Sequence, residues 1–382
     1  MTEQEKITLK KEYGEFICTL AQKKIAIYGT GDYSEYILNN FNKYIVGVVD
    51  DLYKDSSFHG YPVYRTDEVV NKADIIVIMA NIKRLPIIYL RLYSIAKDIE
   101  IRLYNGLTVN KETVYKIIGE NEYWEKSYNE LKKKIDCHDV ISFDIYDTLT
   151  TRTVMKPDDI LKIVARKNDG IDEDIIALRK MAQRNADSKH ISANFDEIYD
   201  EYGKISKLSV NEIERIKTDE LYIETDRTVT RKRMVEALNY AKDKGKKVLL
   251  ISDMYFGKKY MKKILESMAI HGYDGLYVSC DERAWKWPNG DLYKRVAVKE
   301  NISGCKWLHV GNDSGADGLA AQKNGIDSYI VWSTEDMLVN SEYVKLLEEY
   351  GTPEKKDKLG KLMAELFNDP FALNERKGRI YG

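Results

Sequence analysis

The stretch VISFDIYDTLT, from Val140 to Thr150, contains side chains that could carry out a reaction. An apolar run ends in Asp144, Tyr146 stands two places later, and Asp147 comes next. A carboxylate at such a position can act as a nucleophile and form a covalent intermediate with its substrate. Asp144, at the end of the apolar run, is therefore a candidate reactive residue.

Polar residues also end or follow three later apolar runs. They are Ser252 and Asp253 after KVLLI, Lys286 after LYV, and Asn312, Asp313 and Asp317 after WLHVG. In an open parallel sheet, the carboxyl ends of the strands form the ligand crevice. We therefore expect these side chains to converge with Asp144, although they lie far apart in the sequence.

This combination of residue types suits phosphoryl transfer. Carboxylate oxygens bind Mg²⁺ well, and a hydroxyl with a lysine can hold phosphate oxygens. Phosphoryl transfer needs mainly positioning and charge neutralisation, and the set supplies both. A carboxylate cluster without a cation would also repel itself, so the sequence predicts a magnesium site.

Strands and helices must bring these residues together. Five apolar runs are predicted to form one parallel sheet with helices between the later strands: Val140–Phe143, Val248–Ile251, Leu276–Ser279, Trp307–Val310 and Ser328–Trp332. Between the first two strands lie many more residues than a crossover needs, and they have helical periodicity. We predict an inserted helical cap at about 152–232, in which no segment reads as a strand.

A separate α/β unit is predicted before this sheet, over residues 1–110. The segment KKIAIYGTGDYSEYIL reads as a strand, a glycine loop and a helix, and a later helix is predicted over Ile82–Asp98. Gly29, Gly31 and Asp50 stand where a nucleotide-binding fold places its loop glycines and its ribose-binding acid. The loop either binds a nucleotide or nucleotide-sugar, or is a tight turn that lets helix and strand pack. The sequence leaves both interpretations open.

Three further segments complete the predicted organisation. Residues 111–135 read as a charged connecting helix, and the core with its cap spans 136–335. Residues 336–382 read as a helical C-terminal tail, whose apolar side chains indicate docking on the body of the protein.

Composition excludes several classes of protein. The chain has 382 residues, too many for one ordinary domain, and a net charge of -2 from 60 basic and 62 acidic residues. This balance gives no field that attracts nucleic acid, and the longest apolar runs are too short to cross a membrane. The N-terminus reads as polar rather than as a signal peptide, and the four cysteines form no CxxC pair. We expect a cytoplasmic protein with free, buried thiols.

The chain resembles the haloacid dehalogenase (HAD) superfamily of hydrolases. FDIYDTL is similar to the first motif of that family, ISD to the second, Lys286 to the third and GNDSGAD to the fourth, in the same order over about residues 134–333. The resemblance implies an α/β, HAD-like Rossmannoid parallel sheet with an inserted helical cap, here preceded by the Rossmann-like unit. FDIYDTL with ISDMY also looks like a bacterial branch that is often associated with surface-polysaccharide genes.

Roles for the site residues follow from this resemblance. Asp144 would be the nucleophile and a metal ligand, while Ser252 and Lys286 would hold the phosphoryl oxygens. Mg²⁺ would be held by Asp144, the backbone carbonyl of Tyr146, Asn312, Asp313 and Asp317. The cap would select the substrate and close over the site, as lids do to exclude water.

Two positions depart from the pattern of the family's phosphatases. Tyr146 stands where they have a general acid–base aspartate, and Asn312 stands where relatives commonly have Asp. The superfamily's dehalogenases resemble the chain in having this tyrosine; they expel halide, which needs no proton, and use no metal. Asp147 either replaces the missing acid or has a role in the turn, and Asn312 can still bind metal through its amide oxygen.

Three hypotheses about function follow. The first is a Mg²⁺-dependent phosphatase of a small phosphorylated metabolite, a sugar or polyol phosphate, that works through an aspartyl-phosphate. The second is a metal-free, dehalogenase-like hydrolase. The third is a non-catalytic nucleotide- or sugar-binding protein with a decayed site, and the presence of Asp144, Ser252 and Lys286 argues against it. His309, on the strand before the fourth motif, is predicted to be a buried, hydrogen-bonded residue rather than a ligand.

Overall fold

The structure is a computed structural model that describes residues 3–374, apart from 21, 42, 52, 54, 81–84, 93–94, 120, 172, 342, 344–345 and 347–354. It divides into two compact units. The first comprises Met1–Asn121 with Val339–Glu342, and the second comprises Glu122–Leu338 with Tyr343–Gly382. Each unit contains a sheet of mainly parallel strands.

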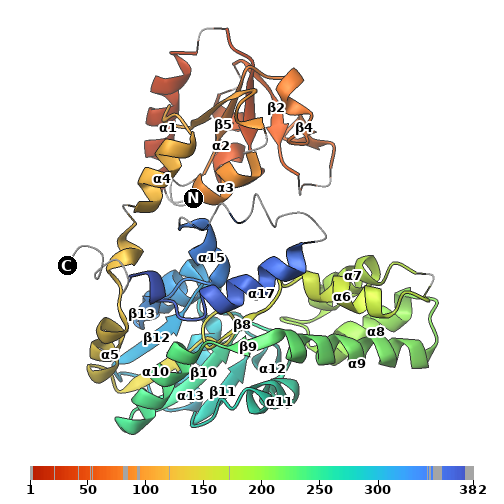
Figure 1. Cartoon of the computed structure of the whole chain (residues 1–382), viewed down its shortest axis with the longest axis vertical. Helices are drawn as coiled ribbons and strands as arrows, with labels where there is room; N and C mark the ends of the chain where they lie inside the picture. Colours follow the sequence, from red (N-terminus) through yellow and green to blue (C-terminus); the bar gives the residue numbers. More distant parts are fainter. Residues whose placement is uncertain are drawn as a thin grey trace. The chain divides into compact units, whose positions relative to one another are not determined.

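The first unit is built on a six-stranded sheet in the order β3-β4-β2-β1-β5-β6 (Figure 1). Its strands are β1 (Ile25–Tyr28), β2 (Ile45–Val49), β3 (Ser57–Phe58), β4 (Tyr61–Tyr64), β5 (Ile75–Ile78) and β6 (Glu100–Leu103). Its helices are α1 (Glu3–Ile17), α2 (Asp32–Asn40), α3 (Leu85–Leu92) and α4 (Lys111–Gly119), with a short 3-10 helix, η1, at Val69–Asn71. The order of the parallel strands reverses between β1 and β5, which is where open α/β sheets place their ligand crevice.

Local sequence explains the elements of this unit. All residues of β1 and β5 are buried, as expected for apolar strands that are covered on both faces. The helix predicted over 82–98 is shorter in the structure, where α3 covers Leu85–Leu92 with Pro86 in its first turn, a favourable place for proline. Residues 82–84 and 93–94 of that prediction lie outside the described residues.

The second unit holds a five-stranded parallel sheet in the order β11-β10-β7-β12-β13 (Figure 1). Its strands are β7 (Val140–Phe143), β10 (Lys247–Ser252), β11 (Gly275–Val278), β12 (Trp307–Gly311) and β13 (Asp327–Ile330). Its helices outside the cap are α5 (Tyr128–Asp136), α10 (Lys232–Asp243), α11 (Lys258–Ser267), α12 (Ser279–Glu282), α13 (Asp291–Lys299), α14 (Ala320–Lys323), α15 (Thr334–Val339) and α17 (Lys356–Leu366). The five predicted strands are confirmed, with ends that differ by one or two residues.

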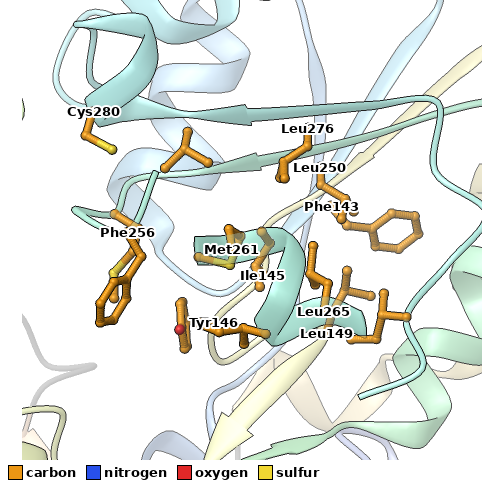
Figure 2. Packing of buried hydrophobic residues seen from close by; sticks show 14 of the residues in the cluster. Phe143, Ile145, Tyr146, Leu149, Leu250, Phe256, Met261, Leu265, Leu276 and Cys280 are labelled. Carbon is orange, nitrogen blue, oxygen red and sulfur yellow. The ribbon is translucent and has the colours of Figure 1, made fainter. Parts of the chain in front are cut away.

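Both faces of this sheet are covered, because alternate residues of a strand point to opposite sides. Ile141 and Phe143 of β7 belong to one cluster of buried side chains, and Val140 belongs to another with Leu292 of α13. Figure 2 shows part of the first cluster, where Phe143 lies near Leu265 of α11. The carboxyl end of the central strand, β7, therefore lies in the interior of the unit.

The cap is inserted between β7 and β10. Its helices, which lie together beside the sheet in Figure 1, are α6 (Asp159–Lys167), α7 (Ile175–Lys189), α8 (Phe195–Ile205) and α9 (Val210–Arg227). Asn194 and Ser209 begin α8 and α9 with capping boxes. Each box satisfies N–H groups that the first helical turn leaves without partners.

The stem of the cap corrects the prediction that the insertion contains no strand. β8 (Thr150–Arg152) and β9 (Thr228–Thr230) pair in antiparallel fashion. Each is three residues long, too short to show the alternation that reveals a strand in a sequence. Their pairing brings the two ends of the insertion together.

The predicted connecting helix over 111–135 is interrupted. α4 ends at Gly119, a 3-10 helix, η4, covers Glu122–Glu125, and α5 begins only at Tyr128. Ser127 caps α5, because its hydroxyl accepts a hydrogen bond from the backbone N–H of Glu130 at 3.2 Å. Glycine and a capping serine favour helix ends, and the boundary between the two units lies at this break.

Residues 355–374 of the C-terminal segment pack into the second unit. Phe371 is fully buried in the same cluster as Phe143. The Asn374 amide donates to the backbone carbonyls of Tyr123 and Lys126 at 2.7 and 2.9 Å. Residues 347–354 and 375–382 of the predicted tail lie outside the described residues.

Arg231, at the exit of the cap, joins this tail to the loop that follows β7. Its side chain is fully buried. It donates to the backbone carbonyls of Asp147 (2.6 Å), Trp332 (2.8 Å), Asn368 (3.2 Å) and Phe367 (3.3 Å). A single guanidinium thus satisfies carbonyls from three separate parts of the unit.

We expect Arg231→Met to lower the free energy of unfolding by on the order of 3 kcal/mol, because it leaves several buried carbonyls without donors. Urea unfolding followed by tryptophan fluorescence measures this loss. Lys232→Met, at an exposed neighbouring side chain, is the matched control. Equal stabilities of the two variants would show that Arg231 does not hold these segments together.

The sequence predicts free, buried cysteines. All four cysteines are free, as predicted, but only Cys280 is buried, while Cys18, Cys137 and Cys305 are exposed. The expectation of buried thiols is thus wrong for three of them, which lie in loops or at helix ends rather than in strands.

Among the described residues, no helix combines the length and apolar character needed to cross a membrane.

Candidate active site

Asp144 lies at the centre of the candidate site because β7 is the central strand of its sheet. Its backbone N–H donates to the carbonyl of Val310 at 2.9 Å, which continues the pairing with β12 beyond the end of β7. Its side chain is 6% exposed. The fold thus holds a carboxylate in the interior, at the carboxyl edge of the sheet.

Lys286 lies against this carboxylate. Its ammonium donates to Asp144 Oδ1 at 2.8 Å and to Asp317 Oδ1 at 2.6 Å, and the lysine is 3% exposed. Its backbone N–H donates to both carboxylate oxygens of Asp253, at 3.0 and 3.1 Å. Residues that follow β7, β10, β11 and β12 therefore meet around one lysine.

Asp317 holds the lysine from the other side. Its Oδ1 also accepts a hydrogen bond from His309 Nε2 at 3.1 Å, and its Oδ2 accepts from the backbone N–H groups of Asn312 (3.0 Å) and Asp313 (2.9 Å). Gly311 allows this approach, because a Cβ there would lie 2.2 Å from Asp317 Cγ. With these donors and the lysine, both oxygens of Asp317 are engaged.

The charges around the lysine do not balance. Burial raises the pKa of Asp144 to about 7, with Asp317 and Asp253 adding to the rise and Lys286 opposing it. Burial would also raise the pKa of Asp317, but Lys286 and His309 lower it below its usual value. Burial raises the pKa of Asp253 as well. This surplus of negative charge favours the uptake of a proton or a cation.

Ser252 and Asn312 lie at the ends of the two strands beside β7. Ser252 is the last residue of β10 and is 2% exposed. Its hydroxyl makes no hydrogen bond to another described residue, so it is available to a ligand. Asn312 Oδ1 lies 3.5 Å from Thr148 Oγ1, which places the loops after β7 and β12 next to each other.

Asp313 caps a helical turn rather than facing Lys286. Its Oδ1 accepts hydrogen bonds from the backbone N–H groups of Gly315 and Ala316, both at 2.7 Å, and the residue is exposed. These bonds begin the turn η5 (Ser314–Leu319). In the structure Asp313 Oδ1 and both oxygens of Asp317 accept hydrogen bonds from the protein. Metal binding by Asp313 and Asp317 stays a prediction.

Tyr146 is a packing residue. It is 8% exposed, and Figure 2 shows its ring near Met261 and Phe256. The guanidinium of Arg152 lies 4.0 Å from the ring centre. Burial, followed by the charge of Glu224, holds the pKa of its hydroxyl well above the usual value. Tyr146 stands where phosphatases of the HAD superfamily carry an acid. Its hydroxyl therefore keeps its proton.

Asp147 is held on the side of the loop that faces β8. Its φ is 56°, in the left-handed region that Asp tolerates better than most residues. Its Oδ1 accepts from Thr151 Oγ1 at 3.2 Å, and it lines a cavity of about 40 Å³ with Arg152 and Thr334. Within the described residues, no hydrogen bond joins the Asp147 carboxylate to Asp144. The Asp144 carboxylate accepts from Lys286 instead.

The oxygen donors near Asp144 fit Mg²⁺. The carboxylate of Asp144, the amide oxygen of Asn312 and the backbone carbonyl of Tyr146 are hard donors on adjacent loops. Mg²⁺ is usually bound by one or two carboxylates together with substrate phosphates. The described residues contain no group of three His, Cys, Asp or Glu that could hold a metal by themselves.

The cap carries buried ion pairs that the sequence reasoning missed. Arg179 donates to both oxygens of Glu220 at 2.8 Å, and Arg152 Nε donates to Glu224 at 2.8 Å. The Tyr255 hydroxyl, in the loop after β10, donates to Glu220 at 3.1 Å. Glu220 and Glu224 lie one turn apart on α9 and so share a helix face, a spacing that was visible in the sequence. The Tyr255 hydrogen bond joins the cap to the loop after β10.

The predicted nucleotide site lies at the switch point of the first unit. Gly29 has φ 98°, which requires glycine, and Gly31 immediately precedes α2. The Thr30 hydroxyl donates to Asp50 Oδ2 at 2.7 Å. α2 begins with Asp32, whose negative charge opposes a pyrophosphate at the helix N-terminus. Nucleotide binding at this loop stays a prediction. The charge of Asp32 favours contacts with hydroxyl groups of a ligand over contacts with its phosphates.

Comparisons with known proteins were made by sequence and by structure. No family model and no curated protein matches the chain. Among solved structures, L-2-haloacid dehalogenase from Xanthobacter autotrophicus is 14% identical with a TM-score of 0.38, over 58% of this chain and 87% of that chain. A predicted phosphoglycolate phosphatase from Haemophilus somnus is 13% identical with a TM-score of 0.34, over 51% and 84%.

The chain is similar in structure to HAD-like hydrolases. The two similar proteins differ in their named activities, one on haloacids and one on a phosphate ester.

Proposed function

We propose that the chain is an HAD-like hydrolase, a Mg²⁺-dependent phosphatase of a small phosphorylated metabolite. The observation that carries this proposal is the Lys286 ammonium, buried between Asp144 and Asp317. The Ser252 hydroxyl lies at the end of the neighbouring strand and has no hydrogen-bond partner among the described residues. A nucleophile, a fixed cation and a free donor are the groups that phosphoryl transfer requires.

The proposed reaction has two displacement steps. An oxygen of Asp144 attacks phosphorus, the bond to the leaving oxygen breaks, and that oxygen takes up a proton from water as the aspartyl-phosphate forms. Lys286 and Ser252 donate hydrogen bonds to the non-bridging phosphoryl oxygens. Water then attacks phosphorus, and phosphate leaves as the Asp144 carboxylate is restored. Mg²⁺, held by Asp144, Asn312 and the Tyr146 carbonyl, would neutralise charge on the phosphoryl group.

The leaving group narrows the class of substrate. General acid catalysis typically contributes about 10²–10⁴-fold, and Tyr146 keeps its proton in a buried position. An ester with a more stable leaving oxygen depends less on an acid. We therefore favour the anomeric phosphate of a sugar over a polyol phosphate, because a hemiacetal oxygen leaves more readily than a simple alkoxide.

The role of Asp147 as a substitute acid is tested by two substrates. We expect Asp147→Asn to lower kcat/KM by less than about tenfold, equally for p-nitrophenyl phosphate and for an alkyl phosphate. Asn tolerates the left-handed backbone and can still accept the hydrogen bond from Thr151. A loss confined to the alkyl phosphate would instead identify Asp147 as the acid, since only that leaving group needs a proton.

The phosphatase itself is tested by phosphate release from a panel of sugar and polyol phosphates, with Mg²⁺ and with EDTA. Turnover that needs Mg²⁺ would support the proposal. If no substrate releases phosphate, while sugar phosphates still raise the melting temperature, a binding role with a decayed site is favoured instead.

One observation favours a second candidate, a metal-free hydrolase that acts at carbon. Tyr146 replaces the acid, and Asn312 supplies a neutral amide where a further carboxylate would strengthen metal binding. Halide release from 2-haloacids in the presence of EDTA would establish this activity. The surplus negative charge around Asp144 makes it the weaker candidate, because nothing in such a reaction would offset that charge.

For the first unit we propose a nucleotide or nucleotide-sugar ligand, bound at the loop that contains Gly29 and Gly31. The proposal is supported by the strand order and by the position of Asp50 after β2. Isothermal titration with nucleotide-sugars tests it. We expect binding that Asp50→Ala weakens, and equal affinity of this variant and wild type would exclude Asp50 as the ribose-binding acid.

A further inference from the structure

A chain of buried hydrogen bonds runs beneath the candidate site. Trp307 Nε1 lies 2.7 Å from Ser142 Oγ, which lies 2.7 Å from His309 Nδ1. His309 Nε2 lies 3.1 Å from Asp317 Oδ1, the oxygen that also accepts from Lys286. The exposed fractions along the chain are 5% for the tryptophan, 0% for the serine and the histidine, and 1% for the aspartate.

The sheet explains why these side chains meet. β7 and β12 are neighbouring parallel strands in which Ser142 is paired with His309. Trp307 stands two places before His309, so both point to the same face of the sheet. Tyr293 of α13 covers this face, with its ring 5.1 Å from that of His309. The chain is thus closed off from solvent along the strand pair.

Donor and acceptor chemistry gives the chain a direction. The Trp307 indole can only donate, so Ser142 Oγ accepts from it, and the Ser142 hydroxyl donates to His309 Nδ1 when that nitrogen is bare. The ionised Asp317 carboxylate can only accept, so His309 Nε2 must carry the proton. The network therefore specifies one tautomer, protonated at Nε2.

We propose that His309 is a positioning residue for the phosphatase reaction, acting through Asp317 on Lys286. Its Nε2–H bond holds Asp317 Oδ1 in the orientation that leaves the Lys286 ammonium shared between Asp317 and Asp144. Without this bond the carboxylate loses one of its four protein donors, on the oxygen that the lysine uses. This inference rests on the proposed function, since Lys286 must act in the reaction for its placement to matter.

The tautomer can be observed directly. The chain contains 5 histidines, and long-range ¹H–¹⁵N correlation spectra separate protonated from bare ring nitrogens. The signals lost in His309→Gln assign His309, and His271→Gln, at an exposed position, is the control. We expect a protonated Nε2 and a bare Nδ1 near neutral pH. A protonated Nδ1, with Nε2 bare or protonated, would overturn the directed chain.

Kinetics of three variants test the positioning role. A Gln amide can place its nitrogen near the Nε2 position, whereas Asn reaches only the Nδ1 position and Leu replaces neither. We expect kcat to fall by about tenfold or more in His309→Asn and His309→Leu, with KM within about twofold, and to fall by less than about threefold in His309→Gln. All rates are measured well below each melting temperature.

Different failures have different meanings. If the three variants lose kcat in proportion to their lost stability, with Gln no better than Asn, His309 only packs and the positioning role is wrong. If the wild type releases no phosphate from any substrate, the proposed function fails and the positioning role fails with it. The tautomer measured by NMR still reports in that case whether the hydrogen-bond chain exists.

Discussion

The Asp144→Asn variant is expected to lose turnover and to be more stable than the wild type above neutral pH. The amide cannot form the aspartyl-phosphate, so phosphate release should fall by at least about a thousandfold. The same change removes a buried carboxylate whose pKa burial raises to about 7. Lys286 keeps Asp317 as its partner at 2.6 Å, so no buried cation is left alone.

The direction of the pH dependence follows from this raised pKa. Between about pH 4, the ordinary value for Asp, and pH 7 the folded wild type holds a proton on Asp144 that the unfolded chain has released. The stability of the wild type therefore falls as pH rises through this window, in total by on the order of 4 kcal/mol from this residue. This loss is expected to be absent from Asp144→Asn.

Urea unfolding of both proteins between pH 5 and 8 measures the difference, with and without Mg²⁺. We expect the two stability curves to diverge with rising pH, and Mg²⁺ to stabilise the wild type but not the variant at pH 8. Parallel stability curves would mean that burial does not raise the pKa of Asp144 in the folded protein. Undiminished phosphate release by the variant would remove Asp144 as the nucleophile.

Lys286→Met is expected to have the largest effect on folding. The variant leaves the carboxylates of Asp144 and Asp317 buried without the cation that lies between them. Removing one partner of a buried ion pair typically lowers the free energy of unfolding by about 3–5 kcal/mol. Activity should be lost as well, because the phosphoryl group loses its fixed positive charge.

Second-site and pH rescue distinguish this cause from a simple packing defect. We expect the stability of Lys286→Met to increase as pH falls from 8 to 5, because protonation relieves the repulsion between the carboxylates. Adding Asp144→Asn should recover part of the loss at pH 8. Lys294→Met, at an exposed lysine of α13, is the control. A pH-independent loss without rescue would point to packing alone.

The positions of the polar residues at the strand ends could be predicted from the local sequence. Apolar runs ending in Asp144 and Ser252 predict that these residues share an edge, because parallel strands end on the same side. The structure has both at strand ends of the same sheet. The alternation in WLHVG also places Trp307 and His309 on one face. These conclusions need only the period of a strand and the direction of the chain.

Other features depended on partners that are distant in the sequence. Asp147 directly follows the position of the missing acid, yet Thr151 and Arg231 hold it at the β8 side. The role of Arg231 could not be predicted from the sequence, because its acceptors are backbone carbonyls, which every residue has. The strands of the cap stem were missed because three residues show no periodicity, and only their pairing across the insertion reveals them.

The fold class, the order of the strands along the chain and the set of residues able to react were readable from local patterns of apolar, glycine and charged residues. Tertiary structure alone decided how those residues are used. Lys286 meets Asp144 across 142 residues and Asp317 across 31, and the register of β7 with β12 pairs His309 with Ser142. Burial then raised the pKa of Asp144, while Lys286 and His309 lowered that of Asp317, because desolvation and neighbouring charge exist only once the chain has folded.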